Sequence, residues 1–489
     1  MPAIFSDHMV LQAGAPAPVW GWANPGSKVS VTVAGQQHNA TSDSKGRWSL
    51  NLSPIKAGGP HEMQVSADST VRIQDILVGE VWLGSGQSNM AMKVNGCDNA
   101  KDEIANASFP QIRMFTVART PNKTAQRNCK GSWVVCSPNT VAAFSGTAYF
   151  FGRRLHKELS VPVGLINSSV GGTPVEAWTS MPAQSKTPEL RALLTGWHKR
   201  GENWRPITNA QFQQRIQAWE KRVEKAKTKG KRKPRRPNRP SDPTLGSDHP
   251  ANLYHGMIHP LIPYRIRGAL WYQGERNAKS MQSAQLYKTQ LPLLISDWRT
   301  RWGQGDFPFL FVQLPNFKKQ QSDPNHASTW AAMRDSMLHS LHVPNTGMAT
   351  TIDVGMANNI HPKNKQAVGS RLAQWALSTV YDQPIPATGP LFQSAEYRDS
   401  SAFVSFQASG GVLQIQTGTV LQGFALAGKD QVFQFAKAEI QSGKVRVWHP
   451  AIPHPVAVRY AWGDNPTCNL GNTAKLPASP FRSDSWELR

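Results

Sequence analysis

The sequence predicts an α/β fold, in which a parallel sheet has helices on both faces and is flanked by an N-terminal and a C-terminal β module. Between about residues 79 and 390, apolar runs of strand length alternate with stretches of helical spacing, such as Val368, Leu372 and Trp375. Such alternation is typical of parallel strands joined by crossover helices. With 489 residues, the chain is long enough for two or three domains with a large core.

The two ends of the chain have the pattern of short β-strands. Residues 1–78 alternate apolar and polar positions, as at Val29–Val33, and turn signals separate the alternating segments. We therefore expect a β-sandwich-like domain there. Residues 391–489 return to alternation, as at Val445–Val447, and are expected to form a second β module packed on the central domain.

A basic insertion interrupts the central domain at about residues 183–250, which begin with helical spacing. Residues 221–239 contain eleven Lys or Arg and one acid, Glu224, and so carry +10 of the formal net charge of +23. They are rich in proline and poor in apolar residues, so we expect a solvated, mobile segment. A more specific hypothesis is an electrostatic tether to an anionic polysaccharide, a cell wall or a nucleic acid.

Several classes of protein are disfavoured by composition. No stretch reaches the roughly 18 apolar residues of a membrane helix, so no membrane span is expected. Cys129 and Cys136 are close enough in sequence to pair in an oxidising compartment, although buried free thiols fit equally well. His255 and His259 have i,i+4 spacing but lack the glutamate of His-Glu-x-x-His. Neither a metal nor another cofactor is expected.

The most informative stretch is Ile76–Met90, where a predicted buried strand ends in a glycine-containing turn followed by Ser88. A strand–turn–helix corner lifts a serine hydroxyl to the C-terminal edge of a parallel sheet, where α/β proteins build their sites. The pattern is not Gly-x-Ser-x-Gly, so the usual nucleophile elbow does not fit. The alternative without a catalytic role is a serine that caps the following helix.

Three more polar motifs follow predicted strands further along the chain. They are Asn167–Trp178, Tyr272–Asn277 and Asn359–Lys365. With Gly86-Gln87-Ser88-Asn89-Met90, they resemble, in order, the motifs of the SGNH-hydrolase superfamily, specifically its sialate O-acetylesterase-like carbohydrate esterases. The resemblance extends over nearly the whole chain.

This resemblance implies an SGNH-type, flavodoxin-like sheet and a serine esterase that removes O-acetyl groups from a carbohydrate through an acyl-enzyme. The substrates implied are sialic acids or acetylated polysaccharides such as xylan and xyloglucan. Members are often exported, which implies a periplasmic or extracellular location, although Met1–Phe5 has no signal-peptide pattern. The sequence predicts no particular oligomeric state.

The motifs assign roles to individual residues. Ser88 is the predicted nucleophile and His361 the base that takes its proton. The predicted oxyanion donors are the backbone N–H of Ser88, Gly172 and the side-chain amide of Gln273, with Asn277 as the alternative amide.

The third member of a triad is missing from its expected place. Asn359 stands where the family usually has an aspartate before the histidine, and an asparagine supplies no charge to an imidazolium. We favour a Ser–His dyad. The alternatives are that Asp353 or Glu275 reaches His361, or that activity is impaired.

Substrate contacts and other functions remain open. Glu176 and Trp178 are candidates for a polar handle and a sugar platform, or for packing at a helix start, and Glu275 and Asn277 are further candidate contacts. The alternative functions are a carbohydrate-binding protein on a weakened esterase scaffold and a nucleic-acid-associated protein that uses the basic insertion.

Overall fold

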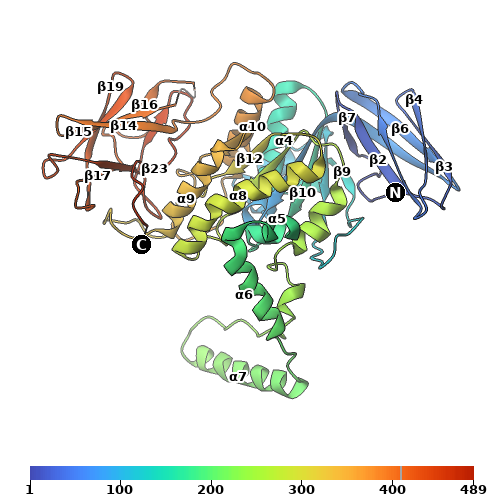
Figure 1. The fold of residues 1–489 in the computed structure, drawn as a ribbon, viewed down its shortest axis with the longest axis horizontal. Coiled ribbons are helices and arrows are strands. Elements are labelled where there is room, and N and C mark those ends of the chain that lie inside the picture. The colour runs from blue at the N-terminus through green and yellow to red at the C-terminus, as the bar shows by residue number, and fades with distance from the viewer. Residues whose placement is uncertain (408–409, 489) are drawn as a thin grey trace.

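A mixed α/β domain forms the centre of the molecule, with a β module at each end (Figure 1). The computed structural model describes residues 1–407 and 410–488. The central sheet has the strand order β13-β12-β11-β7-β10-β8-β9, parallel except for β9. Its strands are β7 (Thr70–Gly86), β8 (Phe109–Thr116), β9 (Trp133–Cys136), β10 (Val163–Ser169), β11 (Gly268–Tyr272), β12 (Phe309–Val312) and β13 (Thr346–Ala349).

Helices cover both faces of this sheet. On one face, α4 (Gly146–Leu159) and α10 (Lys365–Thr379) pack against each other and share a core with Leu270 of β11. On the other face, α8 (Met281–Trp302) and α9 (Thr329–His339) pack together, and Trp298 contacts Trp271 of β11. Neighbouring residues of one strand thus serve opposite cores, as the strand period of two requires. The predicted α/β class with a central parallel sheet is confirmed.

The strand order reverses at β7. Along the chain β11 follows β10, yet the two strands lie on opposite sides of β7. Open α/β sheets bind ligands outside the carboxyl ends of the strands at such a point. A flavodoxin-like sheet would place the second parallel strand beside the first. Here β10 lies between β7 and β8, so the strand order near β8 differs from the flavodoxin-like order. The connection from β7 to β8 crosses the position that β10 occupies.

One long strand joins the N-terminal module to the central domain. The first part of β7 pairs with β6 (Gly58–Ser66) as far as Val78, and β10 takes over as its partner from Glu80. The domain boundary predicted after residue 78 therefore falls inside a continuous strand, where its partner changes. The remaining strands of the module are β1 (Val10–Gln12), β2 (Ala17–Trp22), β3 (Lys28–Val33), β4 (Gln36–Thr41) and β5 (Arg47–Leu52).

The C-terminal module consists of antiparallel sheets. Their strand orders are β14-β15-β20-β19, β18-β17-β21-β23 and β16-β22. The bounds are β14 (Phe392–Arg398), β15 (Ser401–Phe406), β16 (Leu413–Ile415), β17 (Phe424–Ala427), β18 (Phe433–Phe435), β19 (Lys437–Gln441), β20 (Lys444–Trp448), β21 (Ala457–Tyr460), β22 (Leu470–Asn472) and β23 (Phe481–Arg482).

A buried arginine of α9 joins this module to the central domain. Arg334 is fully buried and donates to the carbonyls of Leu314 and Pro315 on one side and of Gly463 and Asp464 on the other, at 2.6–2.9 Å. Burial lowers the pKa of Arg334 to about 10, and these carbonyls satisfy the charged group.

The basic insertion forms an arm that projects from the molecule (Figure 1). The helix α5 (Met181–Ser185) lies against α8 at its base, and α6 (Arg191–Glu202) and α7 (Asn209–Thr228) project, so the first residues of the basic run 221–239 are helical. The chain then folds back on α7, where Trp219 donates from Nε1 to the carbonyl of Pro234 (2.9 Å). Within residues 1–407 and 410–488, no helix is both long and apolar enough to cross a membrane.

Replacing residues 208–238 with a short Gly/Ser linker should change the free energy of unfolding by less than about 1 kcal/mol. The ends of this segment already meet, because Arg239 donates from Nη1 to the carbonyl of Ile207 (3.0 Å), and Ile216 is the buried residue that α7 contributes. Denaturant unfolding of the two proteins tests this expectation. A loss of several kcal/mol would show that the arm is part of the folding unit.

Candidate active site

A glycine turn places Ser88 at the carboxyl edge of the sheet. Gly86 has φ +132°, and a Cβ on it would lie 2.2 Å from the carbonyl oxygen of Tyr272 at the end of β11. The next residue, Gln87, donates its N–H to that same carbonyl (2.9 Å). Ser88 then begins the short helix α1 (Ser88–Ala91). Only glycine allows this approach of two strands, and the approach fixes where the hydroxyl points.

The structure brings Ser88 and His361 together across 273 positions of sequence, with Nε2 of His361 2.9 Å from Oγ of Ser88. His361 lies in the loop between β13 and α10, at the same edge of the sheet as Ser88. Both side chains are partly exposed, so a substrate can reach them. This is the hydrogen bond that a general base needs to activate a serine hydroxyl.

The surroundings of His361 favour the neutral imidazole. Burial lowers its pKa, and the positive charge of Lys365 lowers it further. Lys365 is itself completely buried, and burial lowers its pKa to about 8. Its ammonium group donates to Oδ1 of Asn89 (2.8 Å) and to the carbonyl of Pro362 (2.7 Å). A neutral imidazole is the form that accepts the proton of Ser88.

In the part of the chain that the structure describes, no carboxylate bonds to the ring of His361. Asp353 forms a two-pronged ion pair with Arg371, at 2.6 Å for each oxygen, and does not reach the histidine. Glu275 accepts from Nδ2 of Asn89. Asn359 accepts from the backbone N–H of His361 (3.0 Å) and so shapes the loop instead of orienting the ring. The geometry fits the dyad among the alternatives.

The turn after β10 brings Gly171 beside the nucleophile. A Cβ on Gly171 would lie 3.4 Å from Cβ of Ser88, whereas a Cβ on Gly172 would meet nothing within 4 Å. Gly172 instead supplies the turn, with φ +74°. Among the described residues, the N–H groups of Ser88, Gly171 and Gly172 have no acceptor. They are therefore available to an oxyanion, and Gly171 joins the predicted donors.

The predicted amide donors are engaged elsewhere. Gln273 is completely buried and donates from Nε2 to Asn277 (2.7 Å), to the carbonyl of Thr173 (3.2 Å) and to Oε1 of Gln87 (3.3 Å). Asn277 donates to Oε2 of Glu176 (3.0 Å). These amides brace the loops behind Ser88, and the assignment of Gln273 or Asn277 as an oxyanion donor is corrected accordingly.

The four candidate substrate contacts are also internal. Glu176, Trp178, Glu275 and Asn277 are exposed by only 8%, 0%, 6% and 5%. Burial raises the pKa of Glu176 and of Glu275. Trp178 donates from Nε1 to Oγ1 of Thr173 (3.0 Å) and packs in the core. For Glu176 and Trp178, the structure thus favours packing at a helix start over a sugar contact, because the segment after β10 turns both side chains inward.

The functional residues that the sequence reasoning missed are Asn89 and Lys365, which link the nucleophile helix to the histidine loop. Asn89 is completely buried; it donates to the carbonyl of Ile360 (3.0 Å) as well as to Glu275. One signal was present: Lys365 precedes Val368 and Leu372 at helical spacing, on the apolar face of α10. A lysine on an apolar stripe is rarely buried unless it has partners.

The cysteines and the spaced histidines lie apart from this site. Cys129 and Cys136 are buried free thiols, as is Cys97, and Cys468 is free as well. His255 and His259 bond through Nδ1 to the carbonyls of Asn122 (3.2 Å) and Gln126 (2.8 Å).

A serine–histidine pair at the switch point of a parallel sheet, with free backbone donors beside it, defines the class of serine hydrolases. The family model described as carbohydrate esterase, sialic acid-specific acetylesterase matches residues 78–228 and 248–378, more than half of the chain. The chain therefore belongs to this family of carbohydrate esterases. The family model leaves residues 229–247 unmatched, and these residues form the irregular end of the projecting arm.

Relatives match along most of the chain. It is 29% identical to the sialate O-acetylesterase of Mus musculus, over 97% of this chain and 92% of that protein. It is 30% identical to the Rattus norvegicus sialate O-acetylesterase, over 80% and 75%. The crystal structure of a carbohydrate acetylesterase from Xanthomonas citri superposes with a TM-score of 0.84 at 33% identity, covering 99% of both chains.

Lys365→Met should move the acid limb of the pH–rate profile to higher pH. Removing the buried positive charge raises the pKa of His361, so the imidazole stays protonated, and inactive as a base, to a higher pH. The measurement is kcat/KM against pH on a small acetate ester, with the free energy of unfolding recorded alongside. An unmoved acid limb in a folded variant would remove Lys365 from the control of His361.

Asp353→Asn should leave turnover within about threefold, far from the roughly 10⁴-fold loss that follows when a triad aspartate is replaced. Its carboxylate is 43% exposed and, in the described part of the chain, hydrogen-bonds to Arg371 alone. Glu396→Gln, which removes an exposed carboxylate paired with Lys444, is the matched control. A fall of several orders of magnitude for Asp353→Asn alone would contradict the dyad.

Proposed function

We propose that this protein is a serine esterase that removes O-acetyl groups from a carbohydrate through an acyl-enzyme. The observation that carries the proposal is the 2.9 Å hydrogen bond between Oγ of Ser88 and Nε2 of His361, in a chain of the carbohydrate esterase family. The bond lies at the carboxyl edge of a parallel sheet and is open to solvent on one side.

In the first half of the reaction, Oγ of Ser88 attacks the acetyl carbonyl while Nε2 of His361 takes the hydroxyl proton. The carbonyl oxygen becomes an oxyanion, which accepts from the backbone N–H groups of Ser88, Gly171 and Gly172. When the intermediate collapses, the bond from the acetyl carbon to the sugar oxygen breaks, and the histidine returns its proton to the departing hydroxyl. The acetyl group remains on Ser88.

In the second half, water replaces the sugar. His361 takes a proton from the water as it attacks the acetyl-enzyme, and the same backbone donors hold the second oxyanion. Acetate leaves when the proton returns to Oγ of Ser88. Each half uses the histidine first as base and then as acid, so a pKa lowered by burial favours the base step at neutral pH.

The hydrolase domain is assigned to the SGNH type on the positions of its motifs. Ser88 follows β7, the Gly171–Gly172 turn follows β10, and His361 follows β13, all at one edge of the sheet. The strand order differs from that of a flavodoxin-like sheet only near β8, and this difference leaves the carboxyl ends of β7, β10 and β13 on the same side of the sheet.

The names of the relatives indicate two substrate classes, O-acetylated sialic acids and other acetylated carbohydrates. The projecting arm is a second point of contact in this proposal. Its run of lysines and arginines suits an anionic polymer, which would hold the enzyme near its substrate by an attraction that salt screens.

Ser88→Ala and His361→Ala should each lower acetate release by about 10⁴-fold or more while the fold is retained. Acetate is measured from O-acetylated mucin, acetylated xylan and acetylated xyloglucan, and from p-nitrophenyl acetate. The exposed residues Ser394 and His454 provide matched controls, as Ser394→Ala and His454→Ala. Near-normal release by either site variant would exclude that residue from the mechanism; no release from any glycan by the unsubstituted chain would overturn the function.

A further inference from the structure

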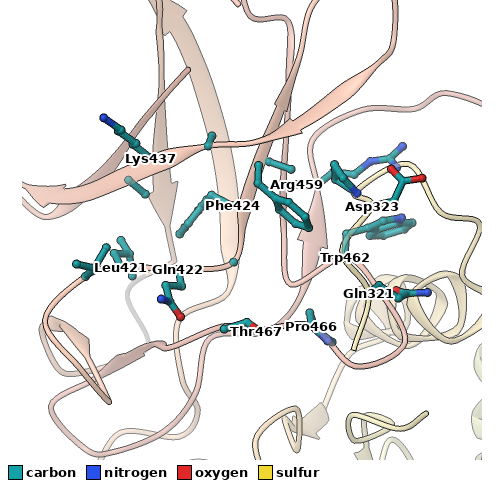
Figure 2. Close-up of a pocket in the computed structure, with 18 of the residues that line it drawn as sticks. Gln321, Asp323, Leu421, Gln422, Phe424, Lys437, Arg459, Trp462, Pro466 and Thr467 are labelled. Carbon is teal, nitrogen blue, oxygen red and sulfur yellow. The ribbon is translucent and has the colours of Figure 1, made fainter. Parts of the chain in front are cut away.

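A pocket of about 590 Å³ lies outside the Ser88 site, where the central domain meets the C-terminal module (Figure 2). One wall is the loop after β12, which contributes Gln321 and Asp323. The C-terminal module contributes Trp462 beside these residues, and Gln422 and Lys437 on the other side of the pocket. Ligand sites occur preferentially at such domain junctions.

The pocket presents apolar and aromatic surface to solvent. Phe435, at the end of β18, is 51% exposed, and Val420 is 65% exposed. Trp448 and Trp462 are partly exposed and line the same hollow. Large aromatic side chains such as these are normally buried, and a cluster of exposed ones in a concave surface indicates a binding site.

Polar side chains lie among these rings. The amide of Gln422 and the ammonium group of Lys437 have no hydrogen-bond partner among the described residues, and both are exposed. Gln321 accepts from the N–H of Asp464 (2.9 Å) through Oε1, which leaves its amide hydrogens free. Thr467 adds a hydroxyl, which accepts from Nε2 of Gln320. The lining therefore offers both donors and acceptors beside apolar faces.

The charges of the pocket favour a neutral ligand. Arg459 is already committed, because it pairs with both oxygens of Asp484 (2.8 and 2.9 Å) and packs on the rings of Phe433 and Trp462. Lys437 and Asp323 remain, and their charges are opposite. A carboxylated ligand would find no two-pronged arginine partner here, which is the usual means of holding a carboxylate.

The pocket is tied to the loop of the catalytic histidine. Its wall begins just after Phe317, whose backbone bridges to Met356, five positions before His361. Phe317 also donates its N–H to the carbonyl of Asp464 (3.0 Å) in the C-terminal module. Because β12 is parallel to the neighbouring strands, this wall lies at the same edge of the sheet as Ser88.

We infer that this pocket binds a neutral sugar unit of the glycan from which the Ser88 site removes acetyl groups, an inference that rests on the proposed function. Sugar rings have apolar C–H faces and a rim of hydroxyls, which match aromatic walls interspersed with amides. A polysaccharide held there and at Ser88 gains from two contacts on one chain, since the second contact is intramolecular.

The test is binding of polymers by the full chain carrying Ser88→Ala, so that no acetyl group is lost during the measurement. The probes are deacetylated xylan, deacetylated xyloglucan and a sialylated mucin, measured by affinity gel electrophoresis. In this background, Phe435→Ala and Gln422→Ala should each raise the Kd for a neutral polymer about tenfold. Both side chains are exposed, so neither change removes core packing.

Matched controls lie nearby. Gln434 is exposed, precedes Phe435 in β18 and points to the other face of the strand, and Trp22 is 37% exposed in the N-terminal module. Gln434→Ala and Trp22→Ala should leave the Kd unchanged. Three results would overturn the inference. They are equal Kd values for the pocket and control variants, no binding of either neutral polymer by the Ser88→Ala chain, and a loss of binding by the pocket variants that is confined to the mucin.

Acetate release by the unsubstituted chain separates this inference from the proposed function. Release without any effect of the pocket variants on Kd would defeat the pocket alone. Pocket-dependent binding without release from any acetylated glycan would defeat the esterase function and leave a glycan-binding site.

Discussion

The contact between Gly86 and the backbone of Tyr272 is the constraint on which the site depends. It ends the 17-residue strand β7 at a position where a Cβ would lie 2.2 Å from the carbonyl oxygen of Tyr272, and Gln87 donates its N–H to the same carbonyl. The backbone of the serine that follows is thereby positioned at the carboxyl edge of the sheet. Since β7 also carries the N-terminal module on its first half, the position of the nucleophile and the attachment of that module are set by one continuous strand.

Around this corner, buried polar groups hold the histidine loop in place. Asn89 bonds to the histidine loop through the carbonyl of Ile360 and to Lys365 and Glu275 on either side. The loop is thereby held without a carboxylate at the imidazole. The same network introduces a positive charge, which keeps the imidazole neutral. A buried amide therefore holds the backbone of the histidine loop, while burial and a nearby ammonium group lower the pKa of the imidazole, an effect opposite to that of a triad aspartate.

The sequence was sufficient for the α/β class, the terminal β modules and the Ser88–His361 pair, because each depends on local periodicity or on a residue at the end of a strand. It failed where direction matters. Nothing local distinguishes a glutamine that faces the substrate from one that faces inward, so the sequence suggested Gln273 as an oxyanion donor and left Trp178 open between a sugar platform and packing. Likewise, which of two adjacent glycines approaches Ser88 depends on the turn that Gly172 makes. The strand order depends on pairing between distant segments, which periodicity does not encode.

The outer part of the projecting arm, residues 208–238, begins and ends at almost one point beyond α6, marked by the bond from Arg239 to Ile207. The rest of the fold depends only on the spacing between the two ends of this segment and not on the residues that connect them. A different segment can therefore replace it during evolution without changes in the packing of the core. For the same reason, the position suits the grafting of a foreign binding module, whose reach to the substrate the length of α6 would set.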